Sequence, residues 1–205
     1  LMVAAAHNGI FWTAASVALV IVLAFILPII KGDAKAGSLQ WLFTIGAVIY
    51  VGFLGVHLIL LRGLDNGQDW VLLAVFSTFI ADTGAYITGR SLRGRFPLHK
   101  LSPLISPSKT VEGAVAGLLI GGLGVVGLNW VLGLRVDILQ ISFLAILIPL
   151  VAIIGDLGES LLKRGSNIKD TSKLIPGHGG FLDRIDALLL TNALVYYYVV
   201  WVILP

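Results

Sequence analysis

Six long apolar stretches dominate this chain of 205 residues and restrict it to one class of fold. A helix needs about 20 apolar residues to cross the hydrocarbon core of a bilayer, and each stretch is about that long. Lipid offers the backbone no hydrogen-bond partners, and the alternating pattern of barrel strands is absent, so we expect helices. The predicted spans are Gly9–Ile30, Leu39–Leu61, Trp70–Thr88, Gly113–Leu134, Ile138–Leu162 and Ala187–Pro205.

The composition agrees with an all-α, polytopic membrane protein. Charged residues make up 12% of the chain, against roughly 25% in soluble domains. The absence of cysteine excludes a disulfide framework and a cysteine-based metal site. Nucleic acid is not an expected partner, because no basic stripe alternates with exposed aromatic residues. We predict a single transmembrane domain over 1–205, with an N-terminal helical pair in 1–68 and the catalytic helices and loops in 69–205.

The distribution of Lys and Arg predicts the orientation in the membrane. With the N-terminus outside, all but two of the 14 Lys and Arg residues fall on the cytoplasmic side, and the exceptions are Arg62 and Arg135. The positive-inside rule therefore predicts an N-out, C-out protein. Acidic residues at membrane depth are costly, and those of this chain converge on the same cytoplasmic face. We therefore expect a polar active-site cavity at that face.

The cytoplasmic end of the fifth span carries one polar stripe. Asp156, Glu159, Ser160 and Lys163 stand at i, i+3, i+4 and i+7, which places them on a single side of a helix. Arg164 follows directly. Such a stripe in an apolar chain is typical of a site that binds a charged ligand.

Three carboxylates from two spans predict a metal site. Asp183 and Asp186 are three residues apart at the start of the sixth span, so both can point into one cavity with Asp156. Hard oxygen ligands suit Mg²⁺, and two metal ions about 4 Å apart would suit phosphoryl or nucleotidyl transfer. Asp82, in the third span, is a further candidate ligand or support. The alternative role for Asp183 and Asp186 is to cap the helix and interact with its dipole.

A glycine-rich turn, 176–180, precedes that pair of aspartates. Three glycines allow a row of backbone N–H groups to form an anion-binding nest before the helix. His178 is either a phosphate donor or an ordinary loop histidine. The neighbouring basic residues strengthen the prediction of a phosphate site, and they are Lys163, Arg164, Lys169, Lys173 and Arg184.

A second polar segment, 81–113, lies between the third and fourth spans. At its end, 106–110 turns into a helix start, where Ser106, Lys109 and free N–H groups are available to a nucleotide or lipid phosphate. The alternative is a capped helix with a lysine that follows the positive-inside rule. Gly113, Gly117 and Gly121 then form a small-residue stripe, which predicts close packing inside one protomer or between two protomers of a homodimer.

These residues together resemble the phosphatidate cytidylyltransferase family, also called CDP-diacylglycerol synthases. The family signature runs from Ser-x-x-Lys-Arg through Lys-Asp and Pro-x-His-Gly-Gly to Asp-Arg-x-Asp. Its positions fall here, without a gap, on Ser160, Lys163, Arg164, Lys169, Asp170, Pro176, His178, Gly179, Gly180, Asp183, Arg184 and Asp186. The stretches 82–86, 106–113 and 155–160 also resemble family motifs.

The resemblance implies the reaction of CTP with phosphatidic acid to give CDP-diacylglycerol and pyrophosphate at the cytoplasmic face of the cell (inner) membrane. It implies Mg²⁺ and admits a second metal ion, a monovalent cation such as K⁺. In this hypothesis Asp156, Asp183 and Asp186 hold metal, with Asp82 in support. The residues that would bind or neutralise the substrates and pyrophosphate are Ser106, Lys109, Ser160, Lys163, Arg164, Lys169, Asp170, His178, Gly179, Gly180 and Arg184.

Two alternatives remain open from the residues alone. A CTP-dependent lipid kinase acting on a polyprenol or phytol would use similar groups but release CDP. A cation-coupled transporter would use acids near the midplane, although the acids here gather at one interface and no inverted repeat is visible. Family members commonly carry further N-terminal helices, and this chain begins with Leu1, which leaves open whether an N-terminal part is missing.

Overall fold

The predicted spans are confirmed as helices in the computed structural model, which describes residues 2–166, 168, 180 and 182–204. Within these residues, six helices are long and apolar enough to cross a membrane, judged by length and composition. Their bounds are Ile10–Lys31, Ala34–Arg62, Gly67–Leu92, Val111–Val131, Ile138–Gly165 and Leu182–Ile203. The chain is therefore a polytopic, helical membrane protein.

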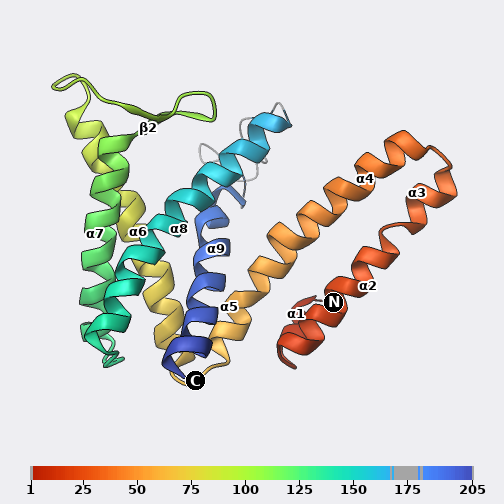
Figure 1. Cartoon of the computed structure of the whole chain (residues 1–205), viewed down its shortest axis with the longest axis horizontal. Helices are drawn as coiled ribbons and strands as arrows, with labels where there is room; N and C mark the ends of the chain where they lie inside the picture. The colour runs from red at the N-terminus through yellow and green to blue at the C-terminus, as the bar shows by residue number, and fades with distance from the viewer. Residues whose placement is uncertain (1, 167, 169–179, 181, 205) are drawn as a thin grey trace.

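The spans are built from shorter elements, and one small hairpin interrupts the helical pattern (Figure 1). In chain order the described elements are α1 (Met2–Ala6), α2 (Ile10–Leu23), α3 (Ile26–Lys31), α4 (Ala34–Ala47), the π-helical turn η1 (Val48–Phe53), α5 (Leu54–Arg62), α6 (Gly67–Leu92), β1 (Lys100–Ser102), β2 (Ser106–Thr110), α7 (Val111–Val131), α8 (Ile138–Gly165), α9 (Leu182–Tyr198) and a second π-helical turn, η2 (Val199–Ile203).

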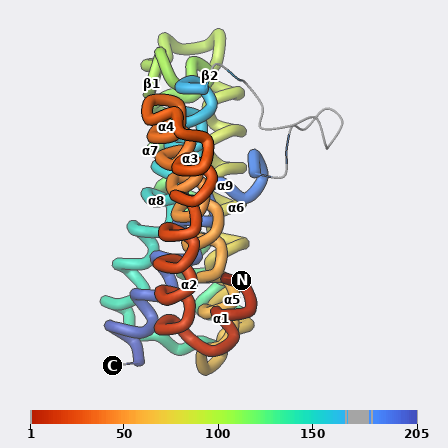
Figure 2. The backbone as a smooth tube through the Cα atoms, turned by 90° about the vertical axis from the view of Figure 1, so that its right-hand side faces the viewer, coloured from red at the N-terminus to blue at the C-terminus, as the bar shows by residue number. Residues whose placement is uncertain are grey.

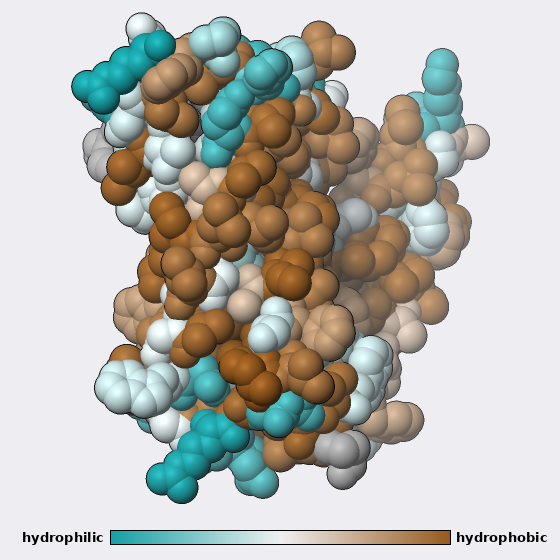
Figure 3. Space-filling model, turned by 60° about the vertical axis from the view of Figure 1, so that its left-hand side comes forward, coloured by the Kyte–Doolittle hydropathy of each residue, from teal (hydrophilic) through white to brown (hydrophobic). Residues whose placement is uncertain are grey.

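The surface has the polarity of a membrane protein. Figure 3 shows a brown, apolar band around the middle of the molecule and teal, polar side chains towards both ends. Large apolar side chains such as Phe43, Leu123 and Phe143 are well exposed. In water such a surface would be unfavourable, whereas lipid covers it without cost.

The first span is broken rather than continuous. Helix α2 ends at Leu23, and α3 begins at Ile26. Pro28 explains the interruption, because a proline lacks the backbone N–H and its ring clashes with the carbonyl four residues earlier, which here belongs to Ala24. The predicted span Gly9–Ile30 is confirmed, and the break at 24–25 lies within it.

The glycine stripe of α7 packs inside the protomer. A Cβ atom added at Gly113 would lie 2.9 Å from the Ala85 carbonyl oxygen, and one at Gly117 would lie 3.0 Å from the Ala81 carbonyl oxygen. At Gly121 the same atom would meet the Ala81 Cβ at 2.6 Å. Only glycine allows α6 and α7 to approach so closely. The stripe therefore gives no support to a homodimer interface.

The hairpin β1–β2 lies across one end of α6, α7 and α8 (Figure 1). Its strands are antiparallel, with Lys100 opposite Thr110. The Thr110 hydroxyl accepts a hydrogen bond from Gly113 N at 3.1 Å and caps α7, so the predicted helix start is confirmed. His99 donates its backbone N–H to Glu112 at 3.0 Å, which fixes the hairpin to the first turn of α7.

The basic connections share one end of the molecule. The α3–α4 turn, the hairpin and the last turn of α8 all lie at the upper end in Figures 1 and 2, whereas the α5–α6 and α7–α8 connections lie at the lower end in Figure 1. The two exceptional arginines, Arg62 and Arg135, belong to the lower connections. This arrangement agrees with the pattern behind the predicted orientation. The side of the membrane that each end faces stays a prediction.

The hydrophobic core occupies the half of the bundle away from the hairpin. It joins α5, α6, α8 and α9 through fully buried side chains such as Leu61, Leu73, Leu144 and Val195. Helix α5 thereby ties the N-terminal helices to the rest, while α4 packs mainly on α3 and η1. The polar end of α6, α8 and α9 lies beyond this core.

Candidate active site

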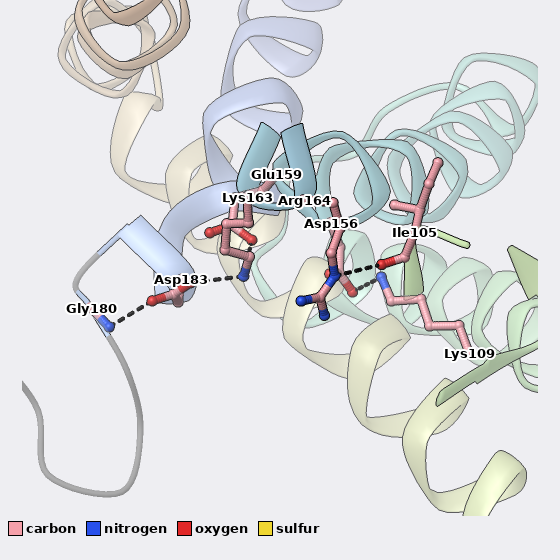
Figure 4. Close-up of polar contacts among 8 residues, drawn as sticks. All are labelled: Ile105, Lys109, Asp156, Glu159, Lys163, Arg164, Gly180 and Asp183. Carbon is pink, nitrogen blue, oxygen red and sulfur yellow. Dashed lines mark hydrogen bonds and ion pairs between the residues drawn. The ribbon is translucent and has the colours of Figure 1, made fainter. Parts of the chain in front are cut away.

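Lys163 is the centre of a charged cluster that joins α8 to α9 (Figure 4). Its ammonium group pairs with Glu159, one turn earlier on α8, and donates to Asp183 Oδ1 at 2.8 Å. The other carboxylate oxygen of Asp183 accepts from Gly180 N–H at 2.6 Å. The side chains of Lys163, Glu159 and Asp183 are only 16%, 2% and 10% exposed. This α8–α9 cluster fixes the start of α9 against α8.

A second contact joins α8 to the hairpin. Lys109, at the end of β2, forms an ion pair with Asp156 of α8. Nearby, Arg164 Nε donates to the Ile105 carbonyl oxygen at 3.3 Å (Figure 4). The Lys109 and Asp156 side chains are 23% and 36% exposed, so this α8–hairpin contact is open to solvent where the α8–α9 cluster is closed.

Three carboxylates from three helices are electrostatic neighbours. Asp82 of α6 is repelled by Asp156 and Asp186, and Asp186 is repelled by Asp156 in turn. Lys109 offsets part of this repulsion at both Asp82 and Asp186. Asp82, Asp156 and Asp186 therefore form an acidic trio whose members come from distant parts of the chain.

A cavity of about 290 Å³ opens between α6, the start of α7, the hairpin and α8. Asp82 and Asp156 line it together with Lys109. Arg90 of α6 and Arg93, which directly follows α6, also line it, so cationic side chains come from two segments of the chain. Carboxylates beside lysine and arginine form a site that can bind an anion, a cation or a complex of the two.

Most of this chain is similar to known proteins. The profile of the cytidylyltransferase family matches residues 1–202. The chain belongs to the cytidylyltransferase family. It is 46% identical over 147 residues to a phosphatidate cytidylyltransferase of Synechocystis sp., and the match covers 68% of this chain and 46% of that protein.

Two further relatives of this chain are also named phosphatidate cytidylyltransferase. A phosphatidate cytidylyltransferase of Bacillus subtilis is 36% identical over 152 residues, which is 74% of this chain and 55% of the relative. One from Brucella suis is 39% identical over 158 residues, covering 73% and 54%. The chain spans about half the length of the curated relatives it matches.

The structure brings together site residues that the sequence places far apart. Asp82, Lys109 and Asp156 share one cavity, and Lys163 meets Asp183. Arg164 contacts the hairpin, as described above. Ser106 is buried in β2 and does not line the cavity, whereas Ser108 and Thr110 do. The remaining described candidates lie near the facing ends of two helices. Ser160 lies on α8, Gly180 precedes α9, and Arg184 and Asp186 lie in the first turns of α9.

Four predicted site residues fall outside the described part of the chain. They are Lys169, Asp170, His178 and Gly179, from the loop between α8 and α9. Their roles stay predictions. The nearest described position of the glycine-rich turn is Gly180, whose N–H group already binds the Asp183 carboxylate.

Some residues of the site were missed as site candidates. Glu159 was placed on the polar stripe but given no role, although its i, i+4 spacing to Lys163 is the usual signal for an ion pair. Arg93 was used only to predict the orientation in the membrane and was not named as a site residue. Asp82, Ala85, Gly89 and Arg93 stand at i, i+3, i+7 and i+11, a helical stripe that could have revealed it.

The acidic trio fits a divalent cation by its chemistry. Carboxylate oxygens are the ligands that Mg²⁺ and Ca²⁺ prefer, and mutual repulsion among three carboxylates is relieved by a bound cation. In the part of the chain that the structure describes, no three His, Asp or Glu side chains are gathered closely enough to hold an ion as they stand. Asp156 and Asp183 are paired with lysines instead.

Proposed function

We propose that this chain transfers CMP from CTP to phosphatidic acid and releases pyrophosphate, which would make it a CTP:phosphatidate cytidylyltransferase of phospholipid biosynthesis. One observation carries the proposal. A chain of the cytidylyltransferase family gathers acidic and basic side chains from three separate segments into one cavity at the polar end of a membrane bundle. The relatives described above are named phosphatidate cytidylyltransferase, and we propose the same activity for this chain.

The proposed chemistry is an in-line displacement. An oxygen of the lipid phosphate attacks the α-phosphorus of CTP, one P–O bond forms, and the bond to the pyrophosphate leaving group breaks. The lipid phosphate is already ionised near neutral pH, so a strong general base is not required. The main obstacle is repulsion between two polyanions, and preorganised cations lower it. Lys109, Lys163 and Arg164 would supply that charge.

The remaining predicted contacts complete this proposal. Pyrophosphate would bind at the glycine-rich turn through His178, Gly179 and Gly180. Lys169 and Arg184 would neutralise further phosphate charge, with Ser106, Ser160 and Asp170 as polar contacts. The two acyl chains would stay in the bilayer, against the apolar band of the helices.

Magnesium is the proposed cofactor, with Asp156, Asp183 and Asp186 as ligands and Asp82 in support. When bound, Mg²⁺ would neutralise negative charge on the triphosphate. Asp183 already uses both carboxylate oxygens within the protein, whereas Asp82 belongs to the acidic trio. If a second metal ion binds, we propose that it is K⁺.

We further propose that the site faces the cytoplasm and that the protein resides in the inner membrane. The chain has no cysteine, so single cysteines report the orientation without background. Ser102→Cys in the hairpin should be protected from a membrane-impermeant maleimide in intact cells and labelled in inverted vesicles. Asp137→Cys, before α8, should behave in the opposite way. A labelled hairpin in intact cells would reverse the orientation.

One assay tests the proposed function. The purified protein is incubated with labelled CTP, phosphatidic acid and Mg²⁺, and lipid-bound CMP and free pyrophosphate are followed together. Equal amounts of the two products are expected. In a parallel reaction with a polyprenol or phytol and CTP labelled in its γ-phosphate, a labelled lipid phosphate with release of CDP would instead indicate a CTP-dependent lipid kinase. The absence of product in both reactions would contradict both hypotheses.

A further inference from the structure

Tyr50 carries a buried hydroxyl that none of the described residues satisfies. It lies in η1, the π-helical turn that joins α4 to α5 in the N-terminal half of the chain. Its Oη atom is shielded from solvent and has no hydrogen-bond partner among these residues. A buried donor without an acceptor is unfavourable, so such groups are few in folded proteins and each one needs a physical explanation.

The packing of α5 on α9 brings Tyr50 level with the start of α9. The two helices run in the same direction along the bundle (Figure 1). A Cβ atom added at Gly55 would lie 3.5 Å from Leu189 Cδ2, and further along the helices the rings of His57 and Tyr196 are 5.5 Å apart. Tyr50 precedes Gly55 by about the same helical rise as the first turn of α9 precedes Leu189. Its side chain therefore belongs to the polar end of the bundle.

The surroundings of the phenol are acidic. Tyr50 interacts electrostatically with Asp186, Glu159 and Asp156, in that order of strength. None of them accepts its proton in a hydrogen bond. Glu159 Oε1 is likewise buried without a partner among the described residues. Two elements thus present unpaired polar atoms beside the acidic trio, and of the two the Tyr50 hydroxyl is the one that can donate to a ligand oxygen.

We propose that Tyr50 Oη donates a hydrogen bond to a phosphate oxygen of the substrate, so that the N-terminal helices supply one wall of the site. The identity of that substrate rests on the proposed function. A phenol is a neutral donor, so it holds a phosphate oxygen without adding charge to the site. The phosphate belongs either to the nucleotide or to the lipid, and the two sources are separated by kinetics.

Tyr50→Phe is the decisive variant, because it keeps the ring and removes only the hydroxyl. Loss of a hydrogen bond to a charged phosphate should lower kcat/KM by about tenfold to a hundredfold. Tyr198→Phe is the matched control. Tyr198 Oη donates to the Gln140 carbonyl oxygen at 2.9 Å, at the end of α9 away from the site, so its removal should leave kcat and both KM values within twofold of wild type.

Separate titrations of CTP and phosphatidic acid identify the contact. A raised KM for CTP with weaker binding of pyrophosphate and Mg²⁺ indicates the nucleotide, whereas a raised KM for phosphatidic acid alone indicates the lipid. A fall in kcat with both KM values unchanged indicates a contact made in the transition state. Each of these results supports the inference, provided that the unfolding midpoint in detergent is within a few degrees of wild type.

Wild-type kinetics and pyrophosphate binding that persist in Tyr50→Phe would overturn the inference. If the wild-type protein forms no lipid-bound CMP, the proposed function fails, and the binding of pyrophosphate with Mg²⁺ by wild type and Tyr50→Phe decides the inference on its own. Weaker binding by the variant would then support the phosphate contact. Equal binding, or none by either protein, would refute it.

Discussion

Two lysines of this protein pair with carboxylates on the same face of α8, in very different surroundings. Lys163 is enclosed with Glu159 and Asp183 between two helices, whereas Lys109 and Asp156 line an open cavity. Enclosed ion pairs hold elements together, and the loss of one partner lowers stability because it leaves a buried charge unpaired. Charges at an open cavity contribute little to folding and remain available to a ligand. The difference predicts that loss of Lys163 lowers stability together with turnover, whereas loss of Lys109 lowers turnover alone.

Removing the enclosed cation should have the largest effect. Lys163→Met leaves the buried Glu159 carboxylate without its paired cation and removes one partner of Asp183, so it should lower the free energy of unfolding by about 3–5 kcal/mol. Chemical unfolding in detergent, followed by tryptophan fluorescence, measures the change. A second substitution, Glu159→Gln, in the same chain should recover part of the loss. An unchanged midpoint in the single variant would contradict the structural role of the α8–α9 cluster.

Removing the open cation should affect turnover instead. For Lys109→Met we expect proposed CMP transfer to fall by about 10²- to 10³-fold, because one preorganised cation of the transition state is lost. Unfolding should change by less than about 1 kcal/mol, as for a solvent-accessible ion pair. Both are measured on one preparation. Lys100→Met is the control, since Lys100 binds the Pro107 carbonyl oxygen on the same hairpin. Similar losses of activity in the two variants would remove the special role of Lys109.

The close packing of α6 and α7 offers a milder perturbation of the open side alone. In Gly117→Ala the new methyl group would lie 2.9 Å from Ala85 Cβ, so the helices must separate. Such overpacking costs about 1–3 kcal/mol and should move Asp82 away from Lys109. Gly127→Ala, with no atom within 4 Å of the new Cβ, should leave stability nearly unchanged. Thermal unfolding of both variants tests this, and equal melting temperatures would contradict the role of the stripe.

The link between hairpin and α8 should be the least costly to remove. Arg164→Ala deletes the hydrogen bond from Arg164 Nε to the Ile105 carbonyl oxygen, which is worth about 0.5–1.5 kcal/mol. Hydrogen exchange should then be faster in β2 than in α9. Faster exchange at α9 instead would show that Arg164 belongs with the enclosed cluster.

The helices were predictable because each span is a long apolar run, and the polar stripe of α8 followed from helical spacing. Three features were not predictable in this way. The break in the first span depends on where Pro28 falls relative to Ala24. Asp156 pairs with Lys109 and is not grouped with Asp183 as predicted, and this pairing depends on how the hairpin folds over α8. The approach of Tyr50 depends on α5 packing on α9, which local sequence does not specify.

The proposed metal ligands divide along the same line as the two lysines. Asp183 is held in the enclosed cluster, and Asp186 interacts with Asp82 and Asp156. Asp183→Asn should therefore lower both stability and activity, and Asp186→Asn activity alone. The most direct test of the account is the formation of lipid-bound CMP from labelled CTP, phosphatidic acid and Mg²⁺ by Asp186→Asn. The account predicts that product is abolished while the unfolding midpoint stays near wild type, whereas near-normal turnover would contradict it.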